Sequence, residues 1–231
     1  MPQGWEATDM GGKGDTVPEA RRSQAERTAS MRARLIDAAV DCLNRLGYSA
    51  TTLSTIAEAA GVSRGGMLHQ FPSKVDLMLA VVAYASGADE RSHQPPALND
   101  DDDDKLAFFM SRTETTWTVL IQEPAMAKLE IMMAARSDKV LAAKLPDMFN
   151  SIEQNRRQRM WELAQEIGIE DREAVDAMVG LHMAAMRGLA MELLVTGDRD
   201  QVERSFGLLK SYKDILIAGL IAKAKEARAS A

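Results

Sequence analysis

The stretch that decides the fold is Thr51–Lys74, TTLSTIAEAAGVSRGGMLHQFPSK. Its first part, Leu53–Ala60, predicts a short helix, because apolar residues recur there at i, i+3, i+4 and i+7. Gly61 predicts the end of that helix, since glycine adopts the left-handed C-terminal conformation without a penalty from Cβ. A second helix is predicted over Arg64–Phe71, with the hydroxyl of Ser63 as its N-terminal cap.

Two short helices joined by a glycine turn are typical of a helix-turn-helix, whose second helix enters the major groove of DNA. The spacing alone fits an ordinary helical corner equally well. The composition of the second helix favours DNA, because its polar residues and glycines are poor choices for burial against a core. Two glycines near the start of a helix cost about 1 kcal/mol each relative to alanine. Close approach of the backbone to another molecule would explain that cost.

The stretch resembles the DNA-binding domain of the TetR family of bacterial transcriptional regulators. The resemblance is detailed over residues 30–80 and rests on Thr52, Ile56-Ala57, Ala60-Gly61-Val62-Ser63, Gly65, Phe71 and Ser73-Lys74. One residue departs from the family pattern: Leu68 stands where the family usually carries a tyrosine that often touches DNA. We therefore expect His69 or Gln70 to take over part of that contact.

The candidate DNA-binding residues are Thr52, Ser63, Arg64, Gly65, Gly66, Leu68, His69, Gln70 and Lys74. Arg64 has the longest donor and could reach guanine O6 and N7 or a phosphate. Thr52 could present a hydroxyl and a helix N-terminal amide to a phosphate, or serve as a cap alone. For Lys74, the resemblance implies a phosphate contact.

Composition predicts an all-α protein, because period-2 runs, Asn-Gly turns and aromatic residues are scarce. The formal net charge is −6, which at first argues against a nucleic-acid partner. The charge is unevenly distributed, however: residues 21–74 contain eight basic and four acidic residues, a net of +4. A basic head on an acidic body suits a DNA-binding protein.

The remaining composition indicates a cytoplasmic protein without a cofactor or bound metal. There is no apolar N-terminal run and no stretch of 18 uncharged apolar residues, so neither a signal peptide nor a membrane span is expected. The single Cys42 is interpreted as a small buried hydrophobe. The Asp100–Asp104 run is interpreted as solvated rather than metal-binding, because tandem carboxylates seldom form a cage.

The chain is expected to divide into four parts. Residues 1–29 are expected to form a disordered basic tail, which is either simply solvated or reaches DNA as an arm. We expect residues 30–85 to form the helix-turn-helix domain and residues 86–104 to form a linker or exposed loop. Residues 105–231 are expected to form a helical body for effector binding and dimerisation. Body helices are predicted over residues 105–122, 124–135, 140–167, 173–195 and 202–223, with the polar segment 153–159 facing solvent.

A mostly apolar effector pocket is expected between the helices of residues 105–167 and helix 173–195. Its candidate residues are Trp117, Met132, Met133, Trp161, His182, Met186 and Arg187. Methionine is pliable and suits adaptable binding surfaces, although plain core filling is the more ordinary role. A buried Arg187 needs a partner, either a carboxylate such as Glu130 or Glu192 or an anionic ligand.

The resemblance implies a homodimer, joined through helices 173–195 and 202–223, that binds a palindromic operator. It also implies a repressor that a small, largely apolar molecule releases from DNA. An enzyme is not expected, because no phosphate-binding loop, HExxH or G-x-S-x-G motif is present and the three histidines are scattered. The alternative is a helical dimeric small-molecule-binding or interaction protein whose DNA binding is weakened at Leu68.

Overall fold

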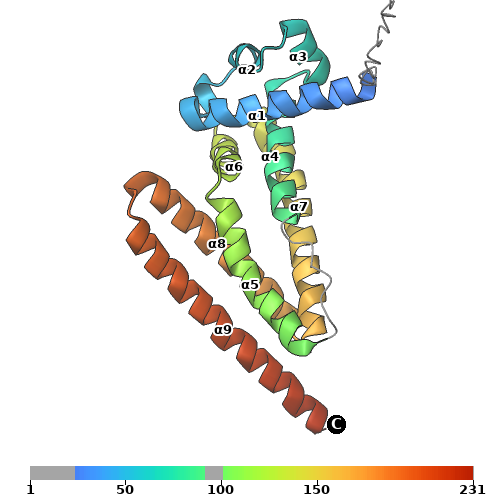
Figure 1. Ribbon diagram of the computed structural model, residues 1–231, viewed down its shortest axis with the longest axis vertical. Helices are drawn as coiled ribbons and strands as arrows, with labels where there is room; N and C mark the ends of the chain where they lie inside the picture. Colours follow the sequence, from blue (N-terminus) through green and yellow to red (C-terminus); the bar gives the residue numbers. More distant parts are fainter. Residues whose placement is uncertain (1–23, 92–100, 231) are drawn as a thin grey trace, which may run out of the picture.

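The computed structural model describes residues 24–91 and 101–230, and every regular element in these two ranges is a helix. The helices are α1 (Gln24–Ala50), α2 (Leu53–Ala59), α3 (Arg64–Gln70), α4 (Lys74–Arg91), α5 (Asp102–Leu120), α6 (Glu123–Ala134), α7 (Lys139–Glu166), α8 (Arg172–Thr196) and α9 (Arg199–Ala229). The predicted all-α class is confirmed. In Figure 1, α1 to α3 form a head at one end, and α5, α7, α8 and α9 form an elongated body.

The breaks between the head helices follow from glycine at positive φ. Gly61 has φ +60°, and its N–H donates to the Glu58 carbonyl at 3.0 Å as α2 ends. Gly47 has φ +72° and ψ 172°, and it interrupts α1 just before the turn into α2. Both are conformations that a residue with Cβ rarely adopts.

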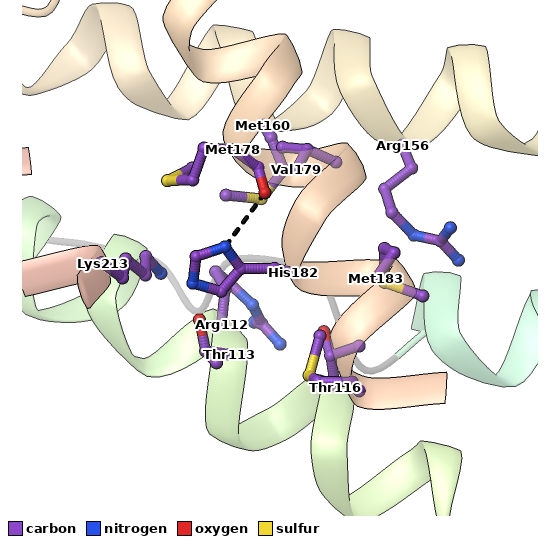
Figure 2. A pocket seen from close by; sticks show the side chains of 11 residues that line it. Arg112, Thr113, Thr116, Arg156, Met160, Met178, Val179, His182, Met183 and Lys213 are labelled. Atoms are coloured by element: carbon purple, nitrogen blue, oxygen red, sulfur yellow. Dashed lines mark hydrogen bonds between the residues drawn. The ribbon is translucent and has the colours of Figure 1, made fainter. Parts of the chain in front are cut away.

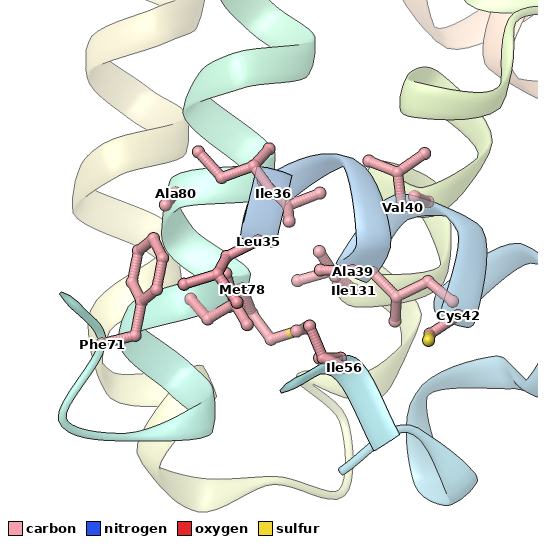
Figure 3. Close-up of a cluster of buried hydrophobic side chains, with 14 of the residues drawn as sticks. Leu35, Ile36, Ala39, Val40, Cys42, Ile56, Phe71, Met78, Ala80 and Ile131 are labelled. Atoms are coloured by element: carbon pink, nitrogen blue, oxygen red, sulfur yellow. The ribbon is translucent and has the colours of Figure 1, made fainter. Parts of the chain in front are cut away.

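Three hydrophobic clusters form the core of the described residues. The first joins the head to the body: side chains of α1 to α4 pack against Ala127 and Ile131 of α6 and Leu141 and Leu145 of α7. Figure 3 shows part of this cluster, with Ile131 among residues of the head helices. Cys42 is buried within it, as the sequence predicted, and burial raises the pKa of its thiol. The other two clusters lie within the body, around Phe109 and around Trp117.

The head cluster crosses the predicted boundary between residues 30–85 and 105–231, so that division into domains stays a prediction. Two of its details were wrong. Residues 24–29, predicted as part of a disordered tail, belong to α1, while residues 1–23 lie outside the described residues. The predicted loop 86–104 is shorter, because α4 continues to Arg91 and α5 begins at Asp102, with Asp101 as its N-cap.

The predicted solvent exposure of residues 153–159 was also wrong for two residues. The Arg156 side chain is 7% exposed and that of Glu153 is 16% exposed, and they form an ion pair of 2.6 Å inside the body. A charged pair can be buried when each partner neutralises the other, which a count of polar residues along the chain does not reveal.

By length and composition, α8 could cross a membrane, whereas the sequence analysis expected no such segment. The core helix of a soluble protein passes the same test, and α8 lines two of the three core clusters here. Packing within the body accounts for the inner face of α8, whereas its outer apolar side chains are exposed and only 33% of the apolar window is buried.

Candidate functional site

Both helices of the helix-turn-helix begin with a side-chain cap. The Thr52 hydroxyl accepts the Thr55 N–H at 3.1 Å, and the Thr55 hydroxyl accepts the Thr52 N–H at 2.8 Å, a reciprocal capping box. The Ser63 hydroxyl accepts the Gly66 N–H at 3.2 Å at the start of α3. The predicted Ser63 cap is confirmed, and the Thr52 hydroxyl is already engaged within the protein.

One face of α3 is anchored and the opposite face is open to solvent. Met67 and Phe71 are each 1% exposed and pack into the head cluster. The outward residues are the candidate DNA contacts: Ser63, Arg64, Gly65, Leu68 and His69 are exposed, and Gly66 and Gln70 are partly buried. The exposed Leu68 could meet the methyl group of a thymine, a contact available to apolar side chains in the major groove.

The two glycines of α3 have different surroundings. A Cβ added at Gly65 would meet nothing within 4 Å, so the backbone there is open to an approaching molecule. A Cβ added at Gly66 would lie 3.2 Å from Val62 Cγ1 and 3.3 Å from Ser63 Oγ. The close-approach explanation given for both glycines therefore applies to Gly65, whereas the turn itself crowds Gly66.

The basic residues of the head serve different purposes. Arg34 donates to the carbonyl of Ala60 and, at 3.4 Å, to that of Gly61, so it braces the end of α2. The Arg32 guanidinium lies 4.4 Å from the centre of the Phe71 ring. Arg64 is exposed on α3 and is the basic side chain best placed to reach base edges.

Lys74, predicted to contact a phosphate, is held at the junction between head and body. Its ammonium donates to the Tyr48 carbonyl at 2.5 Å and lies 3.8 Å from the centre of the Tyr48 ring. Burial lowers the pKa of Lys74, with the Asp138 charge opposing. A phosphate would have to compete with this carbonyl for the ammonium, and the predicted phosphate contact of Lys74 stays a prediction.

Tyr48 is the centre of this junction. Its N–H donates to Glu130 of α6 at 2.7 Å, and its hydroxyl donates to Asp138, the N-cap of α7, at 2.5 Å. Burial and the hydrogen bond to Asp138 raise the pKa of Tyr48, and the same bond holds the pKa of Asp138 below its usual range. Sequence reading missed this junction, because Tyr48 and Asp138 are 90 residues apart.

The body contains a pocket between α5, α7, α8 and α9, with a cavity of about 40 Å³. The side chains that line it are Arg112, Thr113, Thr116, Arg156, Met160, Met178, Val179, His182, Met183, Met186 and Lys213. Figure 2 shows the His182 ring in the middle of the lining, with Lys213 and Arg156 on opposite sides of it.

Of the predicted effector residues, His182 and Met186 line this pocket and the others do not. Trp117 stacks on Phe206 with 5.0 Å between ring centroids, inside a core cluster. Trp161 is half-buried, and the Arg172 guanidinium carbon lies 5.8 Å from the centre of its ring. Met132 borders a separate surface hollow beside Pro146, and Met133 is 47% exposed.

Arg187 has a carboxylate partner, but neither of the two that were predicted. It pairs with Glu153 of α7 at 2.5 Å, and the same Glu153 oxygen accepts from Arg156 at 2.6 Å. Glu153 is thus shared between two guanidinium groups. Desolvation opposes ionisation of Glu153, yet the two positive charges hold its pKa below the usual range.

Sequence reading missed three basic residues of the pocket: Arg112, Arg156 and Lys213. Each is less than 7% exposed. Lys213 donates to the carbonyls of Phe109 at 2.6 Å and Met110 at 3.2 Å, and burial lowers its pKa to about 7. The available signal was weak: Lys213 follows the apolar positions Phe206 and Leu209 at helical spacing, which places it on the inner face of α9.

No group of three or more His, Cys, Asp or Glu side chains that could hold a metal ion occurs within residues 24–91 and 101–230.

One outer face of α8 and α9 is apolar. We call it the α8–α9 face, and it comprises Leu181, Met191, Leu194, Val195, Leu208, Tyr212, Ile215 and Leu216, which are 37–82% exposed. Within it, Gly188 and the neighbouring Ala185 lie beside a shallow hollow between the two helices. Contiguous exposed apolar surface of this kind marks interaction sites.

Comparison with known proteins agrees with the geometry of the head. Residues 35–81 match the family model of bacterial regulatory proteins of the tetR family. The HTH-type transcriptional regulator CymR of Pseudomonas putida is 29% identical over 188 residues, which cover 80% of this chain and 89% of CymR. RutR of Escherichia coli K12 is 36% identical over 70 residues, covering 30% of this chain and 32% of RutR.

Solved structures share the whole fold at low identity. A TetR-family regulator from Cytophaga hutchinsonii aligns with a TM-score of 0.59 at 18% identity, covering 86% of this chain and 97% of that one. Salmonella enterica GusR aligns with a TM-score of 0.56 at 20% identity, covering 84% and 96%. The helix-turn-helix and these similarities lead to one conclusion: the chain carries the DNA-binding domain of the TetR family, a family of non-enzymatic, DNA-binding transcriptional regulators.

Proposed function

We propose that this regulator is a cytoplasmic homodimeric repressor that binds a palindromic operator and leaves it when a small molecule occupies the body pocket. The observation that carries the proposal is the outer face of α3, where Arg64, Gly65, Leu68 and His69 are exposed while Met67 holds the helix to the core. An exposed, rigidly anchored recognition helix is what major-groove reading requires.

Dimerisation is supported by the α8–α9 face. A single helix-turn-helix binds DNA weakly, whereas a two-fold dimer places two recognition helices one or more turns apart on a palindrome. A self-complementary contact requires that the same patch pack against its own copy. The apolar side chains of this face, with the hollow beside Gly188 to receive them, suit such a contact.

Release by an effector is supported by the size of the cavity. One water needs about 10–15 Å³ of such space, so a cavity of about 40 Å³ holds roughly three waters. A larger molecule would enter only if the pocket helices moved apart. A ligand that binds the opened body more tightly than the closed one shifts the population toward it, and hence changes the position of the heads.

Operator binding tests the proposal directly. We would titrate the full chain against the DNA upstream of its own gene at two salt concentrations, with Arg64→Ala and the exposed Arg199→Ala of α9 as a matched control. Loss of a base or phosphate contact should weaken operator binding by about 1–3 kcal/mol for Arg64→Ala, and Arg199→Ala should leave it unchanged. Equal binding by all three proteins would reject the assigned role of α3 and favour an interaction protein.

The salt dependence adds a second readout. Contacts with phosphates release counterions, so affinity should fall steeply as salt rises. Binding that is insensitive to salt would contradict a DNA-binding head of this kind.

A further inference from the structure

We infer that the body pocket binds the carboxylate of a small organic acid, with Lys213, His182 and Arg112 around the anion and methionine side chains around its apolar part. The inference rests on the proposed function in taking this pocket as the effector site. It differs from the largely apolar effector that the sequence predicted.

The first support is the sign of the charges in the lining. Among the described residues that line the pocket, the ionisable ones are Arg112 of α5, Arg156 of α7, His182 of α8 and Lys213 of α9, and all four are bases. Four helices each contribute one, and each side chain is more than nine-tenths buried. Basic groups are seldom buried together unless an anion or another acceptor joins them.

The second support is the unfilled hydrogen-bonding position of His182. The ring is 7% exposed, and its Nδ1 lies 3.0 Å from the Met178 carbonyl, so Nδ1 carries the hydrogen and donates (Figure 2). The other ring nitrogen, Nε2, is buried and has no hydrogen bond of good geometry within the described residues, although the nearby Leu209 backbone favours the charged ring. A buried polar atom of this kind is unusual and points to a partner that enters the pocket. With its only hydrogen on Nδ1, the neutral ring cannot donate through Nε2, so a bound carboxylate requires that His182 take up a second proton, which Nε2 then donates to it.

Lys213 is prepared for the same partner. Its ammonium donates to the backbone carbonyls of Phe109 and Met110, which lie 104 and 103 residues earlier in the chain. Both carbonyls accept a hydrogen bond, but neither carries a negative charge. A carboxylate would supply that charge and accept a further hydrogen bond. Charge-assisted bonds to a carboxylate are about twice as strong as bonds between neutral groups.

Glu153 of α7, the carboxylate that pairs with the pocket residue Arg156, is already engaged. Glu153 accepts from both Arg156 and Arg187 through a single oxygen, so it balances the α7 side of the pocket. Lys213 and His182 lie on α9 and α8 instead, where a ligand carboxylate would complete the charge balance.

The apolar part of the ligand is set by the remaining lining. Met160, Met178, Met183 and Met186 surround the bases, and methionine adapts to irregular shapes. The small cavity favours a short acid over a long-chain one. A carboxylate with a compact hydrocarbon body satisfies both halves of the pocket.

The test uses hexanoate and benzoate as probes, each beside its amide, on the full-length protein. Binding is measured by calorimetry, and release from the operator by fluorescence anisotropy. We expect each acid to bind at least about tenfold more tightly than its amide and to release the operator complex.

Two variants locate the anion. Lys213→Met keeps the length of the side chain and removes the charge, and Lys210→Met makes the same change one turn away on α9, where the side chain is 41% exposed. Lys213→Met should weaken binding of the acids about tenfold and leave the amides unaffected, while Lys210→Met should behave as wild type. Circular dichroism and operator binding without probe establish that both variants fold.

The outcomes separate the two proposals. Operator binding with no response to either acid, or with acid and amide equally effective, overturns the carboxylate inference and leaves the regulator intact. Equal effects of Lys213→Met and Lys210→Met overturn it as well. Failure of the wild type to bind any operator, with the acids still bound in calorimetry, would instead reject the proposed function.

Discussion

Replacing Lys213 by methionine should remove a pH dependence from the stability of the folded protein. The side chain is 2% exposed, and its nitrogen contacts two backbone carbonyls. Burial, followed by the nearby Arg112 charge, lowers the pKa of Lys213 from 10.5 to about 7, against a smaller opposing effect of Asp214. The folded protein therefore binds this proton only below about pH 7, whereas the unfolded chain keeps it to about pH 10.5.

The sign follows from the proton difference. Between the two pKa values the unfolded state holds one more proton, so the free energy of unfolding rises with pH in this window. One proton corresponds to about 1.4 kcal/mol per pH unit, so raising the pH from about 7.5 to about 9.5 should stabilise the wild type by roughly 2–3 kcal/mol through this group alone. Below about pH 7 both the folded and the unfolded state bind the proton, so the contribution of Lys213 to the free energy of unfolding stays at its lowest value.

Urea unfolding at fixed protein concentration, followed by far-ultraviolet circular dichroism at three pH values across that window, measures the effect. The free energy of unfolding of the wild type, relative to that of Lys213→Met, should rise by roughly 2–3 kcal/mol across this window. Other titrating groups contribute equally to both proteins and cancel in the comparison. Lys210→Met, whose side chain is 41% exposed, should run parallel to wild type. Parallel curves for wild type and Lys213→Met would show that the buried lysine keeps its proton, and the reasoning from burial would fail.

Three further predictions address the head, the junction and the outer face. Tyr48→Phe removes the 2.5 Å hydrogen bond to Asp138 and should destabilise the fold by about 1–2 kcal/mol in urea unfolding; unchanged stability would mean that the bond contributes nothing net. Gly65→Ala should raise thermal stability by about 1 kcal/mol, because the added methyl group meets open space, yet weaken operator binding in the titration; tighter or equal binding would show that DNA does not approach this backbone. Ile215→Asp, at a side chain 72% exposed on the α8–α9 face, should yield monomers in sedimentation, while Val140→Asp, at an apolar residue 57% exposed outside that face, should not; a persisting dimer of Ile215→Asp would place the interface elsewhere.

The two helices of the helix-turn-helix could be predicted because their signals are local. The Ser63 cap bonds to an amide three residues away, and the positive φ of Gly61 belongs to one residue and its neighbours. The ends of α5 to α8 fall within three residues of the predicted bounds for the same reason, whereas α9 extends over Arg199–Ala229 instead of 202–223. The residues proposed to face DNA follow from knowing which side of α3 is anchored, and Met67 and Phe71 reveal that side through their spacing.

The body pocket could not be predicted in this way, because its polar groups depend on partners far along the chain. Glu153 and Arg187 are 34 residues apart, and Lys213 lies more than 100 residues from the carbonyls it contacts. Read along the chain, Arg156 looks like part of a solvated run. Its burial is decided by the tertiary pairing with Glu153, and no periodicity encodes that pairing.

One helix connects the pocket to the head. Arg156 lines the pocket from the middle of α7, and Asp138 at the N-cap of the same helix holds the hydroxyl of Tyr48. Eighteen residues of helix separate the two positions, roughly 27 Å at 1.5 Å per residue. Pro146 lies between the two positions, and a proline inside a helix removes one backbone hydrogen bond and favours a kink. Where α7 moves as one unit across Pro146, a ligand that pushes the helix aside at Arg156 also displaces Asp138, and Tyr48 then has to follow or lose its bond. If this junction carries the signal, Tyr48→Phe should bind a carboxylate probe as the wild type does and yet respond to it with a smaller change in operator affinity.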